Sequence, residues 1–175
     1  MERTILKHLL EWKDLKKRKP MLLRGARQVG KSWLVKKLGE SFPDFVEINF
    51  ESRPLLKKIF DEDLTPDFLI PRLSAAVKKP IIPGKTLLFF DEIQQVPNAL
   101  TSLRYFYEEM PDLHVIAAGS LLEFVIEKIG IPVGRVESLY CYPLSFYEFM
   151  IATGNEQLAE LIKNIPENVP LDEPL

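Results

Sequence analysis

The chain has 175 residues, 46% of them hydrophobic, which is enough for one sizeable core and too few for two ordinary domains. Lys and Arg total 23 against 25 Asp and Glu, giving a formal net charge of -2, so no overall positive field recruits nucleic acid. The single cysteine, Cys141, excludes an internal disulfide, and no apolar run approaches the roughly 20 residues of a membrane span. These features predict one globular, cytoplasmic domain that makes no use of a membrane.

The N-terminal segment has the pattern of an amphipathic helix. Ile5, Leu9 and Trp12 recur at helical spacing, which predicts a helix over residues 4–17. The basic run Lys16–Lys19 forms its expected end. This run would contact phosphate or nucleic acid, or, as the simpler interpretation, its cations would interact with the negative end of the helix dipole.

Beyond Pro20 the sequence alternates between strand and helix patterns. Strands are expected at 21–24, 45–50, 86–90, 114–118 and 137–142. Helical segments are expected from the glycine-containing loop to residue 42, and at 54–60, 66–77, 100–110, around 124–125 and at 145–152. In the last of these, Ser145 and Glu148 have capping-box spacing. This order predicts an α/β fold: a three-layer αβα P-loop NTPase with a mainly parallel five-stranded sheet, preceded by the N-terminal helix.

The segment Gly25–Ser32, GARQVGKS, matches G-x-x-x-x-G-K-[ST] completely and lies between a predicted strand and a predicted helix. Glycines let such a loop curl so that its backbone N–H groups point at phosphate, and the helix N-terminus adds a positive dipole. Lys31 would reach the β- and γ-phosphates, and the Ser32 hydroxyl would ligate Mg²⁺. The expected nucleotide-binding residues are Gly25, Ala26, Arg27, Gln28, Val29, Gly30, Lys31, Ser32 and Trp33. Whether Arg27 and Gln28 contact phosphate or a partner stays open.

The apolar run at 86–90 ends in an acidic pair. Asp91 is placed to hold the metal and its water shell, and Glu92 to activate the attacking water, since phosphoryl transfer depends on charge stabilisation and alignment. Acidic pairs at strand ends are also common as solvated turns. Together with the phosphate loop, the pair favours a catalytic role.

Two further residues are candidates for catalysis. Ser120 follows the strand at 114–118 and would orient the water near the γ-phosphate, or cap the next helix. Arg135, after Gly134, would act as an arginine finger toward a neighbouring subunit, or form a structural ion pair. Arg104 is a rival for that role, but its helical position favours a surface salt bridge.

Four segments together resemble one known family: LLRGARQVGKS, LLFFDEIQ, VIAAGS and GRVESLYCYPLSFYEF. They are similar to bacterial and archaeal P-loop ATPases of the AAA+ superfamily, in which an N-terminal ATPase domain precedes a C-terminal domain of unknown or nuclease-like function. The resemblance covers about residues 1–155. It implies that Lys31 and Ser32 belong to the first nucleotide motif, that Asp91 and Glu92 belong to the second, and that Ser120 is the sensor.

The resemblance also implies a sheet of five parallel strands with the phosphate loop after the central one. Residues 156–175, rich in proline, are interpreted as a tail or a truncated linker. No counterpart of the usual AAA+ helical lid, with its second sensor arginine, is evident. ATP and Mg²⁺ are the expected ligands. A homo-oligomer, and DNA bound through a C-terminal domain that these residues do not include, are candidate partners.

Three functions remain in competition. The leading one is Mg-dependent ATP hydrolysis that switches the conformation of an attached domain or partner. A nucleotide-dependent binding or scaffold module with little turnover is the second. A small-molecule kinase is the third, and Glu92 directly after Asp91 favours water over another acceptor. A GTPase is disfavoured because the sequence contains no N-K-x-D motif.

Overall fold

The computed structural model describes residues 3–120, 122–130 and 134–164. Its sheet has five strands, all paired in parallel, in the order β2-β3-β4-β1-β5. The strands are β1 (Met21–Arg24), β2 (Asp44–Asn49), β3 (Thr86–Asp91), β4 (His114–Ala118) and β5 (Glu137–Tyr140). The predicted parallel five-stranded sheet is confirmed. The expectation that the phosphate loop follows the central strand is wrong, because β4 is central and β1 lies between β4 and β5.

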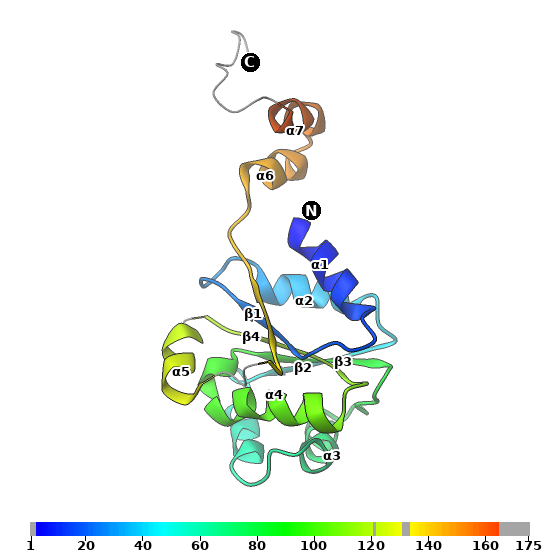
Figure 1. Ribbon diagram of the computed structural model, residues 1–175, viewed down its shortest axis with the longest axis vertical. Coiled ribbons are helices and arrows are strands. Elements are labelled where there is room, and N and C mark those ends of the chain that lie inside the picture. The colour runs from blue at the N-terminus through cyan, green and yellow to red at the C-terminus, as the bar shows by residue number, and fades with distance from the viewer. Residues whose placement is uncertain (1–2, 121, 131–133, 165–175) are drawn as a thin grey trace.

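Helices cover both faces of the sheet (Figure 1). On one face, α1 (Thr4–Lys13) and α2 (Lys31–Gly39) bury Leu9, Leu34 and Leu38 against Leu23 and Phe89 of the sheet. The other face is covered by the 3-10 helix η1 (Pro54–Phe60), α3 (Pro66–Val77), α4 (Pro97–Glu109) and α5 (Leu122–Ile129). This is the predicted three-layer αβα fold with an N-terminal helix.

Successive strand residues serve different cores, as the period of a β-strand requires. In β3, Leu87 and Phe89 pack toward α1 and α2, whereas Leu88 and Phe90 pack toward α3 and α4. Every residue of β3 and of β4 is buried. Their apolar sequences therefore reflect burial on both faces, and the polar groups that follow them are brought to one edge of the sheet.

The N-terminal helix is shorter than the sequence predicted. It ends at Lys13, with Asp14 as its C-cap, and the chain then turns back on the helix. The indole of Trp12 donates to the carbonyl of Lys19 at 2.8 Å, and Arg18 donates to the carbonyl of Asp112 at 2.7 Å. The basic run thus lies after the helix, so its expected place in the last helical turn is wrong.

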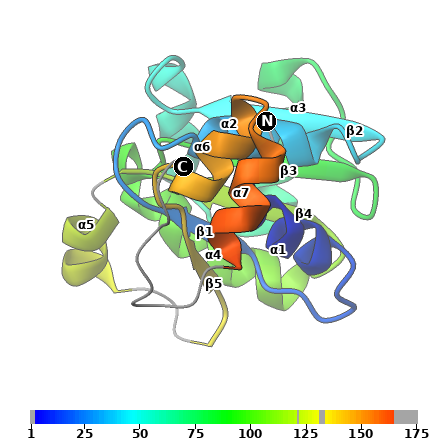
Figure 2. The same ribbon diagram turned by 90° about the horizontal axis from the view of Figure 1, so that it is seen from above.

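Two short helices end the described chain. Helix α6 (Phe146–Ala152) begins with the predicted capping box of Ser145 and Glu148. Helix α7 (Glu156–Lys163) was not predicted, and it occupies part of the expected proline-rich tail; residues 165–175 of that tail lie outside the described residues. Figures 1 and 2 show α6 and α7 on the side of the sheet that carries α1 and α2, and beyond them.

Across the described ranges, no helix combines the length and the apolar character that crossing a membrane requires.

Candidate functional site

The phosphate loop joins β1 to α2 through a backbone that uses positive φ angles at three positions. Gly25 has φ +139°, Gln28 has φ 65° and Gly30 has φ 92°. Gly30 is the N-cap of α2, and its carbonyl accepts from the N–H of Leu34 at 3.0 Å. Glycine reaches such angles without the steric cost that a side chain adds, so the motif's glycines stand where the curled loop needs them.

The start of the loop rests directly on the chain that leaves β5. The N–H of Cys141 donates to the carbonyl of Arg24 at 2.7 Å. A side chain at Gly25 would overlap the carbonyl oxygen of Cys141. The Cys141 thiol is itself buried, and this burial raises its pKa. The residues that follow β5 therefore pack against the start of the loop. The raised pKa means that the Cys141 side chain there is a neutral thiol rather than a thiolate.

Lys31 lies inside the loop that it belongs to. It is only 8% exposed, and its Nζ donates to the carbonyls of Gly25 at 2.9 Å and of Ala26 at 2.6 Å. An ammonium group has three donors, so these bonds fix the side chain across the mouth of the loop. Its charge is thereby held within the loop whose N–H groups the motif assigns to phosphate.

Ser32 and Asp91 come together as the sequence predicted. The Ser32 hydroxyl donates to Oδ2 of Asp91 at 2.9 Å, and the side-chain amide of Asn49 donates to the same oxygen at 3.1 Å. Burial raises the pKa of Asp91, the hydrogen bond from Ser32 opposes that rise, and the neighbouring charge of Glu92 adds to it. A hydroxyl and a carboxylate thus share one point at the carboxyl end of β3.

Glu92 departs from the strand in a left-handed conformation, with φ 54° and ψ 44°. It is the N-cap of the short 3-10 helix η2 (Ile93–Gln95), and its carboxylate accepts a hydrogen bond from the side-chain amide of Gln94. A non-glycine residue with positive φ is uncommon and costs on the order of 1–3 kcal/mol. Such strain beside a phosphate loop is typical of a functional position.

The phosphate loop, the start of α2, Glu92 and Ser120 surround a cavity of about 200 Å³. Ser120 lies two residues after the end of β4, and Glu92 lies one residue after the end of β3, so neighbouring strand ends bring the two residues to one place. Trp33 is 39% exposed at the rim, and Arg27 pairs loosely with Glu51 at 3.9 Å. The lining residues are Arg27, Gln28, Gly30, Lys31, Ser32, Trp33, Glu92 and Ser120.

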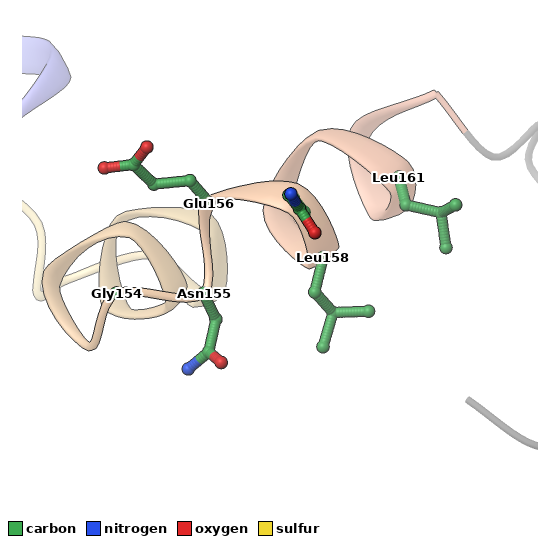
Figure 3. A pocket seen from close by; sticks show the side chains of 6 residues that line it. Gly154, Asn155, Glu156, Leu158 and Leu161 are labelled. Atoms are coloured by element: carbon green, nitrogen blue, oxygen red, sulfur yellow. The ribbon is translucent and has the colours of Figure 1, made fainter.

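A larger hollow, of about 670 Å³, lies at the turn between α6 and α7 (Figure 3). Its wall is a single stretch of chain, from Gly154 to Leu161, and includes no residue of the phosphate loop. Leu158 and Leu161 project from α7 there, with Asn155 and Glu156 at the start of the helix. This hollow is larger than the cavity beside the phosphate loop, but Lys31, Ser32, Glu92 and Ser120 converge on the smaller one.

Arg135 does not line the phosphate cavity. Its Nε donates to Oε1 of Glu108 on α4, and Arg104 donates to the same carboxylate at 3.1 Å. These two arginines lower the pKa of Glu108, with the hydrogen bond from Arg135 as the larger cause. The structure thus shows the ion pairs that the sequence offered as the alternative fates of Arg135 and Arg104.

Arg3 is a site residue that sequence reasoning missed. It is 6% exposed, and it donates to the carbonyl of Val29 in the phosphate loop at 3.1 Å and to that of Tyr142 at 2.7 Å. Its Nε also pairs with Glu148 of α6 at 3.3 Å. One buried cation therefore joins the loop, the β5 exit and α6. No motif marks Arg3, because its partners are 26 to 145 residues away in the chain.

Asn49 and Gln94 were also missed. Asn49 ends β2, where its side-chain oxygen accepts from the N–H groups of Glu51 and Ser52 while its amide reaches Asp91. The pairing of β2 with β3, with Asn49 opposite Asp91, was the only signal that would have found it. Gln94 is two residues from Glu92, so the sequence shows that the two residues are neighbours. It does not show that the side chain of Gln94 points toward the carboxylate of Glu92.

The donor set fits a magnesium nucleotide. Mg²⁺ prefers oxygen ligands and is usually held by one or two protein groups together with phosphates and water. Ser32 and Asp91 supply a hydroxyl and a carboxylate, next to a loop that would hold the phosphates. Within the described ranges no three acidic, histidine or cysteine side chains cluster as a metal cage.

Comparisons with known proteins give a match to a family and similarity to solved structures. A comparison with curated protein sequences found no match. Among solved structures, that of C. elegans PCH-2 is similar at 20% sequence identity and a TM-score of 0.48, over 96% of this chain and 49% of that one. The chain thus spans about half the length of that structure. Residues 17–150 match the protein family described as AAA domain. Because the match spans more than half of the chain, the protein belongs to the AAA domain family and is a nucleotide-binding ATPase domain.

Proposed function

We propose that this domain binds ATP with Mg²⁺ and hydrolyses it, and that the cycle switches the conformation of an attached domain or partner. The hydrogen bond from Ser32 to Asp91, at 2.9 Å, carries the proposal. It brings the second nucleotide-motif carboxylate into contact with the end of the phosphate loop. The two motifs therefore form one site.

Each residue has a proposed role in that reaction. The loop amides and Lys31 would hold the phosphates, and Ser32 and Asp91 would hold Mg²⁺, which would supply neutralisation of the phosphate charge. Glu92 accepts a proton from water as the water oxygen bonds to the γ-phosphorus and the bond to the β,γ-bridging oxygen breaks, releasing ADP and phosphate. Ser120 orients the water.

Arg135 stays a prediction as a finger. Its present partner, Glu108, leaves it 43% exposed on the surface, where it is accessible to a second copy of the domain. A finger acting between copies would exchange Glu108 for a phosphate oxygen, which is a stronger charge partner.

The proposed switch has a physical route through Arg3. A nucleotide that moves the carbonyl of Val29 changes the position of Arg3, and with it that of Glu148 at the start of α6. Charge-assisted bonds between buried groups transmit such shifts because they cannot be lost without cost. Helix α6 itself carries exposed aromatic side chains, with Phe146 63% and Phe149 50% exposed. This supports α6 as the part that an attached domain or partner senses; a nuclease-like C-terminal domain acting on DNA is the candidate that the sequence resemblance raises.

Lys31→Ala tests the phosphate site. Removing the ammonium should reduce ATP affinity at least tenfold while the far-UV circular dichroism spectrum stays unchanged. ATP binding is measured through the fluorescence of Trp33, which lies at the rim. Lys37→Ala, on the exposed side of α2, is the matched control. Normal ATP affinity in Lys31→Ala would place the phosphates elsewhere.

Glu92→Gln tests the base. The variant should retain ATP binding, and its rate of phosphate release should fall about 100-fold, which is the size typical of lost general-base catalysis. Phosphate release is measured with and without DNA, on this chain and on any longer parent. A wild-type chain that binds ATP without turnover would instead support the scaffold function.

Asp91→Asn tests the metal role. The amide keeps the shape of the carboxylate but removes the charge that attracts Mg²⁺. The gain in ATP affinity between EDTA and Mg²⁺ should therefore be smaller in this variant than in the wild type. An unchanged gain would remove Asp91 from the metal site.

A further inference from the structure

The side chain of Gln94 occupies a defined position between the ends of β3 and β4. It belongs to η2, and its amide nitrogen donates to Oε2 of Glu92. An amide that donates to a carboxylate forms a charge-assisted bond, and this direction is the favourable one, because the reverse would place oxygen against oxygen. The nitrogen of Gln94 is therefore committed to Glu92.

Among the described residues, the side-chain oxygen of Gln94 is held in place by packing rather than by a hydrogen bond. Its Oε1 is buried, and no hydrogen-bond donor contacts it within the part of the chain that the structure describes. It lies against Gly119, where even a methyl group would overlap it. Burying an acceptor without a partner is unfavourable, so this position is held by the bond to Glu92 and by the space that Gly119 leaves.

The location of this contact links two parts of the candidate site. Gly119 directly precedes Ser120, and Ser120 and Glu92 line the same cavity. Gln94 is not part of that lining, and it reaches the cavity only through its hydrogen bond to Glu92. The amide thus connects the proposed base to the strand end that carries the proposed water-orienting hydroxyl.

We propose that Gln94 is the positioning residue for Glu92, and that Gly119 has no side chain because the amide of Gln94 occupies the space. Glu92 leaves β3 with φ 54°, and its carboxylate has several rotamers open to it. The bond from Gln94 selects one of them, which directs the free carboxylate oxygen to the cavity. This inference rests on the proposed hydrolysis, with Glu92 as its base.

Gln94→Met is the first test. Methionine preserves length and volume but cannot donate, so kcat for ATP should fall about tenfold, as for lost supporting hydrogen bonds at other sites, with KM unchanged. Gln95→Met is the matched control: it is the same change at the next residue, which is exposed and whose side-chain oxygen accepts from Lys57 at 3.2 Å. It should leave kcat unchanged. A Gln94→Met variant with unchanged or raised kcat overturns the proposal.

Gly119→Ala is the second test, because it moves the amide without altering it. The added methyl group should displace the end of the Gln94 side chain and reduce kcat to a similar extent. Combining Gly119→Ala with Gln94→Met should give no further loss, since both remove the same bond. Additive losses would mean that Gly119 acts by another route, and would overturn the role assigned to it.

A measurement without turnover separates this inference from the proposed function. In a proton–nitrogen correlation spectrum, one amide proton of Gln94 should lie downfield because it is bonded to a carboxylate. It should move upfield in Glu92→Leu and in Gly119→Ala, and remain in place in Gln95→Met. No movement overturns the contact. If Glu92→Gln hydrolyses ATP normally, the proposed base fails; if it is inactive while Gln94→Met is normal, only the positioning role fails.

Discussion

At the scale of single residues, Gly25 shows how closely the loop and the sheet edge approach each other. Its φ is +139°, and the carbonyl oxygen of Cys141 occupies the space that a side chain would need. Two separate constraints, one of conformation and one of space, therefore select glycine. The second constraint involves backbone, which cannot turn aside as a flexible side chain does.

Gly25→Ala should lower the free energy of unfolding by about 3 kcal/mol or more, because the strain of positive φ and the overlap with Cys141 add. Gly84→Ala is the control. Gly84 also has positive φ, at +77°, but no atom lies within 4 Å of the added carbon. It should cost about 1 kcal/mol. Urea unfolding measures both, and equal losses would mean that the contact with Cys141 exerts no steric constraint.

The sequence identified the residues of local motifs and missed those whose partners are distant. The sequence predicts roles for Lys31, Ser32, Asp91 and Glu92 because phosphate chemistry fixes their spacing or their place at a strand end. Asn49 and Arg3 have ordinary neighbours in the sequence, and only the pairing of β2 with β3 and the packing of α1 near α6 give them a role. The contact of Gln94 with Glu92 depends on a side-chain rotamer, which no sequence pattern specifies.

At the scale of elements, the start of α1 meets the start of α6 beside the phosphate loop. The N–H of Thr4, at the start of α1, donates to Oε1 of Glu148 at 2.8 Å, and Arg3 pairs with the same oxygen. Burial raises the pKa of Glu148, but the N–H groups of Ser145 and Thr4 and the charge of Arg3 outweigh it, so the pKa lies below its ordinary value. Helices α1 and α6 are joined through an ionised, buried carboxylate.

Arg3→Ala should lower the free energy of unfolding by about 3 kcal/mol, because Glu148 then stays buried without its counter-charge. The exposed pair of Lys37 and Glu40, at 2.6 Å, gives the comparison, and Lys37→Ala should cost less than 1 kcal/mol. Arg3→Ala should also abolish any change that ATP produces in the hydrogen exchange of α6. A nucleotide effect that persists in this variant would exclude Arg3 as the route.

His114 lies in β4 and contacts α1, and its surroundings predict that the fold is sensitive to acid. It contacts the rings of Trp12 and Phe42, and its Nε2 lies 3.1 Å from the carbonyl of Lys13. Burial and, to a smaller extent, Arg18 lower its pKa from 6.5 to about 4. The folded protein therefore holds this ring neutral at pH values where the unfolded chain protonates it.

The stabilising contribution of neutral His114 is thus complete above pH 6.5 and is lost as the pH falls from 6.5 toward 4. Between pH 7 and pH 5 the free energy of unfolding should decrease by about 1–2 kcal/mol from this group, allowing for partial solvent access. His114→Phe keeps the aromatic packing and should show a correspondingly smaller decrease. An equal decrease in both proteins would assign the acid sensitivity to other groups.

Helix ends illustrate why element boundaries were harder to predict than elements. The apolar pattern of α1 continued to be compatible with helix through residue 17, but Trp12 and Arg18 bond to carbonyls that only a reversing chain can offer. Helix α7 was hidden by the prolines that follow it. By contrast, the capping box of α6 is a local signal, and the structure confirmed it.

At the scale of the whole molecule, strand order was the feature that sequence could not supply. The chain passes from β1 to β2 at the far edge and then returns through β3 and β4. Alternating strands and helices predict a parallel sheet, but they leave the direction of each crossover open. The resemblance implied that the loop follows the central strand, and this was wrong because β4 is central.

The contacts of α7 predict that this helix can be removed without loss of nucleotide binding. Its buried residue, Ala159, and the bond from Tyr147 to Glu160 at 2.6 Å tie it to α6. A chain ending at residue 155 should therefore bind ATP within about twofold of the full chain, measured by titration against Trp33 fluorescence. A tenfold loss would make α7 part of the nucleotide site.

The bonds of Lys31 bear on which ligands the loop selects. The Nζ of Lys31 donates to the carbonyls of Gly25 and Ala26, so the ammonium has acceptors within its own loop. A phosphate that binds Lys31 has to compete with these carbonyls. Selectivity should therefore favour ligands with charged oxygens, because a charge-assisted hydrogen bond is stronger than one to a neutral carbonyl.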